Sequence, residues 1–308
     1  MKKISKVYFV FILSVVAVVF ACNQSSDSKN NTETIIKGST SILVDETLKP
    51  IIEDQIAVFE SKYDAKIKMI AQSEAEAINS LLKDSSRIAV LSRTLSVKEL
   101  ELFQKRKITP KVTKFAVDAI AFISNKSNKD TLIALKDVID FMQGKPKSSI
   151  KGLVFDNPNS STVRYMNELA GLKTSPEKGI FSFKTNEDVI KFVSENEGMI
   201  GVVGVNWLSQ PSPAMAAYVQ NVNMLGVKST TGTAFFEPTQ NNIAEGTYPL
   251  ARDLYIINCQ GFSGLGMGFS SFVAGDIGQR IILKSGLLPI RIPGRNIMIR
   301  KEIENNKK

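Results

Sequence analysis

A strand that turns into a helix through three hydroxyl side chains is the feature that most constrains the fold of this chain. Residues 154–155 are apolar and β-prone, residues 156–159 read Asp-Asn-Pro-Asn, and a helix-spaced apolar pattern begins at the hydroxyl residues after them. The first turn of a helix presents free backbone N–H groups at the positive end of its dipole, which suits a small anion. Two interpretations are open for Ser160, Ser161 and Thr162: Ser160 or Thr162 caps the helix, or the group binds an anion.

Hydroxyl side chains also follow three strands that the sequence predicts in the first third of the chain. After the strands expected at 35–37, 65–70 and 87–91 come, in order, Thr40 with Ser41 in a turn expected at 38–41, Ser73, and Ser92 followed by Arg93. In an open α/β sheet, ligands bind at the carboxyl ends of the strands, so we expect these side chains to line one pocket. The arginine among them favours an anionic ligand.

The remainder of the chain supplies one acid and one tryptophan of interest. Asp118 lies in a long apolar strand at 114–124, and it either faces solvent at a strand end or belongs to the pocket. Trp207 is expected to be a core or lobe-packing aromatic. A strand at 248–257 is expected to return to the first half, followed by one helix at 269–285.

The N-terminal residues predict export and a lipid anchor. Residues 1–21 have a basic start and an apolar stretch too short to span a membrane comfortably, which is typical of a signal peptide. They end next to Cys22 in a pattern that resembles a bacterial lipobox; the alternative is an ordinary signal peptide and a coincidental cysteine. Residues 22–34 are polar and read as a flexible tether. We therefore expect a protein anchored by lipid outside the cytoplasmic membrane, in the periplasm or at the cell surface.

Composition excludes several classes of function. The 308 residues contain no histidine, so neither a Ser-His-Asp or Cys-His mechanism nor a His-ligated zinc site can be built. No phosphate-loop or dinucleotide-binding motif is present. The net charge of +9 falls to +6 without the three lysines of the signal peptide, and the remaining lysines are scattered, so no nucleic-acid partner is expected. Cys259 lies in an apolar run and is expected to be a buried small hydrophobe.

Seven short motifs follow one another in a characteristic order. They are Gly38-Ser39-Thr40-Ser41, Ser92-Arg93-x-Leu95-Ser96, Asp118 opening an apolar strand, Asn159-Ser160-Ser161-Thr162-x-Arg164, Gly198-x-Ile200-Gly201, Tyr248-Pro249-Leu250-x-Arg252-x-Leu254-Tyr255, and Gly278-Gln279-x-Ile281 followed by Gly286-x-x-Pro289. In these motifs the chain resembles the phosphate-binding solute receptors of bacterial ABC importers, a branch of the type II periplasmic-binding-protein fold. The resemblance covers nearly all of the mature sequence.

This resemblance implies an α/β fold of two lobes, joined by two crossing strands that serve as a hinge and closing on a dehydrated phosphate ion. Lobe I would comprise residues 35–115 and 250–308, and lobe II residues 116–249. It also implies a monomer that binds phosphate, delivers it to the permease subunits of an ABC importer, and needs neither a cofactor nor a metal ion.

The resemblance also implies a set of ligand-binding residues. Lobe I would contribute Thr40, Ser41, Ser73, Ser92 and Arg93, and lobe II would contribute Ser160, Ser161 and Thr162. The family often has Ser-Gly-Thr at 160–162 and an arginine just upstream, where this chain has Asp156 and Asn157; Arg93 or Arg164 would then supply the positive charge. Either Asp118 or Asp156 would accept the proton of phosphate, which sulfate lacks at neutral pH.

Two other hypotheses remain beside the phosphate receptor. The first is a tethered receptor or sensor for another oxyanion or small anionic solute. The second is an enzyme, such as a phosphatase that uses a carboxylate or a serine. The missing histidine and the lack of a dense carboxylate cluster for metal ions argue against an enzyme.

Overall fold

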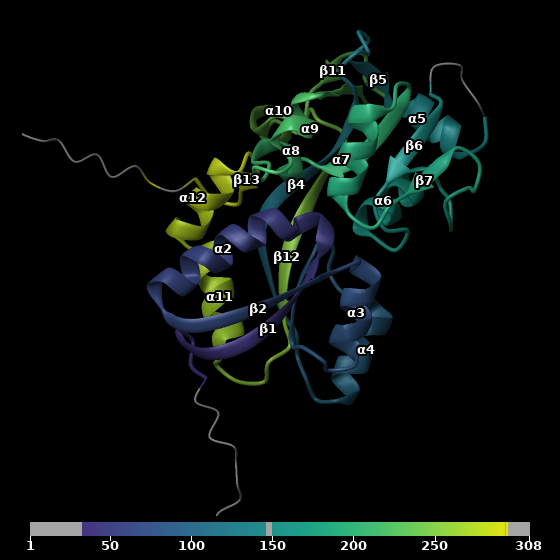
Figure 1. Cartoon of the computed structure of the whole chain (residues 1–308). Helices are drawn as coiled ribbons and strands as arrows, with labels where there is room; N and C mark the ends of the chain where they lie inside the picture. Colours follow the sequence, from purple (N-terminus) through teal and green to yellow (C-terminus); the bar gives the residue numbers. More distant parts are fainter. Residues whose placement is uncertain (1–32, 146–149, 293, 295–308) are drawn as a thin grey trace, which may run out of the picture. The chain divides into compact units, whose positions relative to one another are not determined.

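The computed structural model describes residues 33–145, 150–292 and 294 of the chain (Figure 1). The expected signal peptide at 1–21, the expected lipidation site Cys22 and the expected tether up to residue 32 lie outside the described residues. Residues from Thr34 onward belong to one structural unit. Among the described residues, no helix combines the length and the apolar character needed to cross a bilayer.

The main sheet has two halves that meet at one long strand. In the first half, β1 (Lys37–Asp45) lies between β2 (Asp64–Gln72) and β3 (Ile88–Leu91) and runs parallel to both. The strand β12 (Ala251–Asn258) pairs antiparallel with β3 on one side and with β4 (Lys111–Asn125) on the other. The order in this half is therefore β2-β1-β3-β12-β4.

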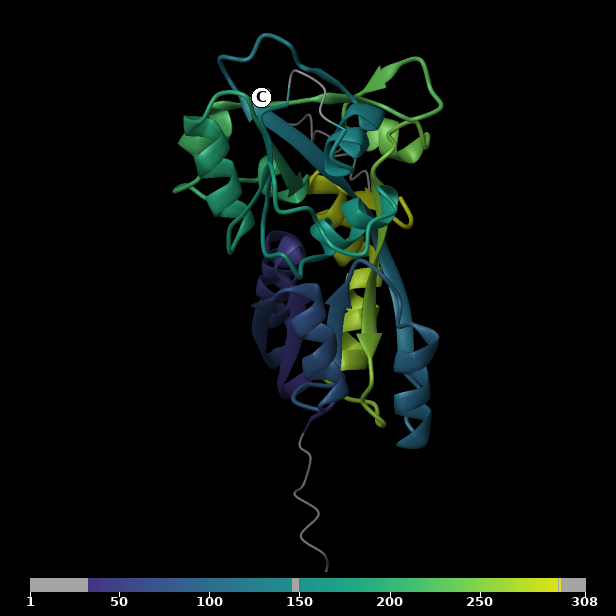
Figure 2. The same cartoon turned by 90° about the vertical axis from the view of Figure 1, so that its right-hand side faces the viewer.

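The second half begins where β4 leaves β12. From Ile120 to Ser124, β4 pairs antiparallel with β8 (Met199–Gly204), and β6 (Gly152–Phe155) lies parallel between β8 and β7 (Ile180–Ser182). Strand β4 thus joins the two halves, and in Figure 2 the yellow-green strand β12 runs beside it. The remaining strands are β9 (Val222–Met224) and β13 (Leu288–Pro289), which pair with β4, and β5 (Leu132–Ala134), β10 (Gly226–Lys228) and β11 (Phe235–Phe236), which form a small sheet.

Helices cover both faces of the first half. They are the 3₁₀ helix η1 (Glu46–Leu48), α2 (Lys49–Lys62), α3 (Glu74–Leu82), α4 (Val97–Lys105), α11 (Leu265–Ala274) and α12 (Asp276–Lys284). Successive strand residues point to opposite faces, and β1 uses this alternation. Ile42 shares a hydrophobic cluster with Phe59 of α2 and Phe269 of α11, whereas Leu43 shares another with Leu81 of α3 and Phe103 of α4. Figure 1 shows these two pairs of helices on either side of the strands.

The second half is also covered on both faces. Its helices are α5 (Leu135–Met142), α6 (Ser161–Leu169), α7 (Asn186–Glu195), α8 (Asn206–Ser209), α9 (Ala216–Gln220) and α10 (Gln240–Ala244). Along β6, Val154 packs in the cluster that contains Val189 of α7. Its neighbour Phe155 packs in the cluster that contains Val138 of α5 and Met166 of α6. The predicted strand, turn and helix around residues 154–166 are confirmed.

The beginning of the fold differs from the sequence prediction. A turn was expected at 38–41, but Thr40 and Ser41 lie inside β1, opposite Ile67 and Lys68 of β2. The strand continues because the apolar run at 42–44 is buried between two layers of helices, where its backbone groups need the sheet as partner. The turn follows only at residues 45–46, where β1 ends and η1 begins.

The helix expected at 269–285 is two helices. Its interruption lies at Gly275, whose backbone is extended, with φ −82° and ψ 174°. The chain folds back so closely after it that a Cβ atom on Gly278 would lie 2.4 Å from the carbonyl oxygen of Val273. A side chain at residue 278 would therefore prevent α11 and α12 from meeting at this angle.

Candidate functional site

The beginning of α6 shows the helix cap, which is one of the two alternatives that the sequence left open. Ser160 is the N-cap: its Oγ accepts a hydrogen bond from the backbone N–H of Val163 at 3.2 Å. The same hydroxyl donates to Asp156 Oδ1 at 2.5 Å. Asp156, Ser160, Ser161 and Thr162 are all at most 2% exposed, so the group faces the interior of the protein. The cap therefore serves to hold a buried carboxylate at the helix N-terminus.

The turn after β1 meets this helix from the first half of the sheet. Thr47 is fully buried, and its hydroxyl donates to Asp156 Oδ2 at 3.4 Å. The Thr47 hydroxyl also lies 3.4 Å from the Thr162 hydroxyl and 3.5 Å from that of Ser161. Three hydroxyl groups from two halves of the sheet thus converge beside one carboxylate.

A buried arginine completes this group from β12, which pairs with the strand β4 that joins the halves. Arg252 of β12 donates from Nε and Nη2 to Asp118 Oδ2, at 3.2 Å and 2.8 Å. Its third nitrogen, Nη1, donates to Ser161 Oγ at 2.9 Å. Asp118 also accepts the backbone N–H of Ala119. Asp118 is fully buried in the middle of β4, so the interpretation of a strand-end acid that faces solvent is wrong.

We refer to these side chains together as the central cluster: Asp45, Thr47, Asp118, Asp156, Ser160, Ser161, Thr162 and Arg252. Asp45, the last residue of β1, is fully buried and accepts the backbone N–H of Thr47 at Oδ1. Its other carboxylate oxygen, Oδ2, is one of four buried side-chain atoms among the described residues that have no hydrogen-bond partner.

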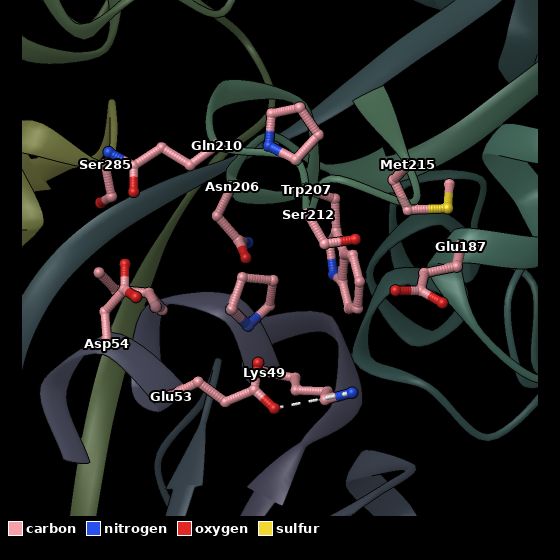
Figure 3. Close-up of a pocket in the computed structure, with 13 residues that line it drawn as sticks. Lys49, Glu53, Asp54, Glu187, Asn206, Trp207, Gln210, Ser212, Met215 and Ser285 are labelled. Atoms are coloured by element: carbon pink, nitrogen blue, oxygen red, sulfur yellow. Dashed lines mark ion pairs between the residues drawn. The ribbon is translucent and has the colours of Figure 1, made fainter. Parts of the chain in front are cut away.

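Asparagine and tryptophan side chains hold the turn at Thr47 in place. Asn206 Nδ2 and Trp207 Nε1 both donate to the carbonyl oxygen of Thr47, at 3.1 Å and 2.9 Å. Both side chains also line a cavity of about 210 Å³ over the first turn of α2, where Figure 3 shows them above Lys49 and Glu53. The prediction that Trp207 is a buried packing residue is confirmed, and its indole N–H in addition fixes the central cluster.

Asn186, at the beginning of α7, connects two carboxylates. Its Nδ2 donates to Glu46 Oε2 at 2.7 Å and to Asp156 Oδ2 at 3.1 Å. The amide oxygen of Asn186 accepts the backbone N–H of Gly204 at 3.4 Å. This contact fixes the amide orientation, so the amino group faces the acids.

The central cluster contains three buried carboxylates, Asp45, Asp118 and Asp156, and one buried cation, Arg252. The pKa of each carboxylate is raised. Burial raises the pKa of Asp45 to about 7 and that of Asp156 to about 6, although the charge of Arg252 opposes both shifts. Burial also raises the pKa of Asp118, again against the effect of Arg252. At the edge of the cluster, burial raises the pKa of Glu46 to about 8. The cluster therefore gains and loses protons near neutral pH.

Three of the predicted residues form a second group beside the central cluster. Ser73 caps α3 in a reciprocal capping box with Glu76. The Ser92 hydroxyl donates to Glu74 Oε1 at 3.1 Å, and Arg93 donates from both terminal nitrogens to Glu99, at 2.9 Å and 2.8 Å. The capping box with Glu76 fixes the position of Ser73, and the ion pair with Glu99 fixes that of Arg93, so no ligand is needed to explain these positions.

Thr40 and Ser41 do not reach either group. Ser41 lies four residues before Asp45 in the same strand, which corresponds to about 13 Å. Its carbonyl oxygen accepts the hydroxyl of Ser86, and Thr40 lies one residue further away. The expectation that these two hydroxyls stand at the end of the first strand is wrong, because the strand runs on to Asp45.

Thr47, Asp45 and Arg252 were missed as site residues. Asp45 and Thr47 follow the apolar run at 42–44 and precede Pro50, a residue tolerated in the first turn of a helix, so this turn could have been found. Arg252 had a weaker signal: it is the one cation in the mostly apolar strand at 248–257, as Asp118 is the one acid in the strand at 114–124. Pairing Arg252 with Asp118 requires knowing that the strands are neighbours.

The central cluster has the groups that an oxyanion requires. Arg252 supplies a charge-assisted donor, the three hydroxyls of Thr47, Ser161 and Thr162 supply neutral donors, and the first turn of α6 supplies backbone N–H groups at the positive end of its dipole. In the described part of the chain, no three His, Cys, Asp or Glu side chains are grouped so that they could hold a metal ion.

Comparison with known proteins finds relatives that are named as phosphate-binding proteins. The chain is 26% identical to the phosphate-binding protein PstS of Borreliella burgdorferi over 314 residues, covering 94% of this chain and all of that protein. It is 23% identical to PstS of Pseudomonas aeruginosa, covering 83% of this chain and 84% of that protein.

Solved structures show the same fold. A protein from Clostridium perfringens solved with bound phosphate superposes with a TM-score of 0.68 at 21% identity, covering 82% of this chain and all of the other. An ABC-type phosphate transport receptor from Vibrio cholerae gives a TM-score of 0.61 at 17% identity, with the same coverage. The expected α/β fold of type II periplasmic binding proteins is thereby confirmed. Residues 29–276 match the model of the PBP superfamily domain, and the chain belongs to this family.

Proposed function

We propose that this protein is a receptor that binds inorganic phosphate in the central cluster and delivers it to an ABC importer. The ion would lie between the turn after β1 and the N-terminus of α6, replacing contacts that the hydroxyls of Thr47, Ser161 and Thr162 now make with one another. Relatives named as phosphate-binding proteins, matched along most of the chain, support this function.

The contact between Arg252 and Ser161 is the observation on which the proposal chiefly rests. Arg252 is 5% exposed and is oriented by Asp118, so its Nη1 is held against the helix N-terminus. A buried guanidinium aimed at a turn of hydroxyls matches a tetrahedral oxyanion in charge and geometry. Arg252 therefore takes the role that the sequence left to Arg93 or Arg164, because all three nitrogens of each of those face glutamates, whereas Arg252 directs Nη1 to Ser161.

Selectivity for phosphate would depend on a carboxylate that accepts the proton of the ligand. Asp118 and Asp156, the two candidates from the sequence, already accept hydrogen bonds at their cluster-facing oxygens. Asp45 Oδ2 is buried and has no partner, so we assign the accepting role to Asp45. Phosphate carries a proton that can satisfy this oxygen, whereas sulfate at neutral pH does not and would be repelled.

The cellular setting follows from the same proposal. A lipid on Cys22 and the tether after it would keep the receptor at the membrane, outside the cytoplasm, where it would act as a monomer beside the permease subunits. Residues 35–115 with 250–308, and residues 116–249, would act as two lobes that close on the ion about β4 and the segment before β12. Binding and release, without chemical change of the ligand, would be its whole activity.

Calorimetric titration tests this function directly. The purified protein is freed of bound anion by partial unfolding and refolding, then titrated with phosphate and separately with sulfate. We expect tight binding of phosphate that excess sulfate does not displace. Equal binding of both anions would favour a receptor for another oxyanion, and heat with neither would contradict the assignment. Release of product from a chromogenic phosphate ester would instead indicate an enzyme.

A further inference from the structure

Glu74 is a buried carboxylate that receives cations from both halves of the sheet. It is the first residue of α3 and is 2% exposed. From the first half, Arg93 Nε lies 3.8 Å from Glu74 Oε2. From the second half, Arg164 Nε donates to the same oxygen at 2.5 Å, and Arg164 Nη2 lies 3.4 Å from Oε1. Arg164 is thus the closer of the two cations, although it comes from the other half.

Further contacts run between the halves at the same place. Arg164 Nη2 donates to the hydroxyl of Ser92 at 3.1 Å, and Ser92 donates to Glu74 Oε1 at 3.1 Å, which closes a ring of three side chains. Next to it, the backbone N–H of Ala75 donates to the carbonyl oxygen of Asn159 at 3.2 Å. The turn before α6 is therefore tied to the beginning of α3 by backbone and side chain alike.

The position of Arg164 links this ring to the central cluster. Arg164 lies in α6 only one turn after Ser160 and Ser161, so a force on its side chain acts on the helix that holds the proposed anion site. In the same helix, Glu168 accepts two hydrogen bonds from Arg164 Nη1, at 3.1 Å and 3.0 Å. When the halves separate, Arg164 retains Glu168, whereas Glu74 loses its nearest cation.

We propose that Glu74 and Arg164 form a latch that holds the two halves together and thereby sets the rate at which the bound anion leaves. The two residues are positioning residues, since neither belongs to the central cluster. The identity of the anion rests on the proposed function; the latch itself rests on the contacts between the halves. Breaking a buried, hydrogen-bonded charge pair acts mainly on dissociation rates, whereas association is governed by encounter with the open site.

Dissociation measurements on matched variants test the latch. Bound radiolabelled phosphate is chased with excess unlabelled phosphate for the wild type, Glu74→Gln, Arg164→Gln and the double variant. We expect dissociation to be about tenfold faster or more in each single variant. The association rate should stay unchanged, and the double variant should be no faster than the faster single one. Glu168→Gln, which removes only the contact inside α6, is the matched control and should release phosphate at the wild-type rate.

Two results would overturn the latch: wild-type dissociation in both Glu74→Gln and Arg164→Gln, or equal acceleration by Glu168→Gln. A second measurement separates the latch from the choice of ligand. Spin labels are attached at Lys98→Cys in α4 and Lys184→Cys before α7, both exposed, in a Cys22→Ser background. Without any ligand, Arg164→Gln should lengthen or broaden the distance between the labels. This result would support the latch even if phosphate fails to bind, and an unchanged distance would contradict it.

Discussion

Arg252 of β12 lies directly opposite Asp118 of β4 in the sheet, and its Nη2 is 2.8 Å from Asp118 Oδ2. Asp118 lies in β4, the strand that joins the two halves of the sheet, and β12 pairs beside it, so the guanidinium is fixed to the most central part of the fold. Because Asp118 holds Nε and Nη2 of Arg252, the third nitrogen, Nη1, is held against Ser161. The geometry of the proposed anion site thus depends on an ion pair outside α6.

Replacing Asp118 by Asn should destabilise the protein strongly, because Arg252 would remain buried without its nearest counter-charge. We expect the free energy of unfolding to fall by about 3 kcal/mol, as measured by denaturant unfolding without ligand at pH 7. The neighbour of Arg252 in β12, Asp253, provides the control. Asp253 pairs with Lys114 in a half-exposed ion pair, so Asp253→Asn should cost less than about 1 kcal/mol. Equal effects of the two variants would contradict the importance of the buried pair.

Arg252→Gln should weaken phosphate binding by about tenfold to a hundredfold, because a charge-assisted hydrogen bond to the ion is lost. Calorimetric titration of the variant against the wild type measures the change in Kd. Arg87→Gln is a suitable control, since Arg87 is an exposed residue paired with Asp84. An unchanged Kd for Arg252→Gln would show that the cation of the site lies elsewhere.

Thr47 lies in the turn observed after β1, whereas Thr40 lies where the sequence predicts a turn. Replacing each threonine tests which of the two hydroxyls binds phosphate. Thr47→Val removes a buried hydroxyl that touches Asp156 and Thr162, so we expect phosphate affinity to fall by about tenfold. Thr40→Val changes a residue within β1, away from the cluster, and valine is favoured in strands, so affinity should stay as in the wild type. The reverse ranking in the titrations would mean that the sequence prediction had named the right hydroxyl.

Local sequence patterns predicted those parts of the site that lie within one short segment of the chain. The cap at Ser160 and the strand before it follow from an apolar pair, a turn and a helix period within 13 residues, and they are confirmed. The same reasoning failed at Thr40, where glycine and small polar residues suggested a turn. The burial of the adjoining run at 42–44 between helices overrode that local preference.

Long-range pairing determines the rest of the site. Arg252 and Asp118 are separated by 134 residues, and only the order of strands in the sheet brings them together. Likewise folding places Glu74 beside Arg164, 90 residues away in the sequence, whereas the partner of Arg93, Glu99, is only six residues away. Whether a buried charge is neutralised depends on such partners, and local sequence patterns do not predict which residues these are.

Stability without ligand should decrease as the pH rises from about 4 to about 7. The pKa of Asp45 is raised to about 7 and that of Asp156 to about 6, above their values in the unfolded chain. Between the unfolded and folded pKa values the folded state holds more protons, so the free energy of unfolding falls with rising pH. Thermal unfolding across this range measures the effect, and Asp45→Asn should make the dependence weaker. A steeper dependence in Asp45→Asn would contradict the raised pKa.

Trp207 should report anion binding through its fluorescence. It is the single tryptophan of the chain, it is 7% exposed, and its indole N–H donates to the carbonyl oxygen of Thr47. An ion that displaces the contacts of the Thr47 hydroxyl will shift this carbonyl and change the polarity around the indole. We expect emission to change with phosphate with the same midpoint that calorimetry gives, and in Arg252→Gln we expect this midpoint to move to a phosphate concentration about tenfold to a hundredfold higher. If calorimetry shows saturable binding while the emission of the wild type stays constant, the ion binds away from Thr47 and the central cluster is not its site.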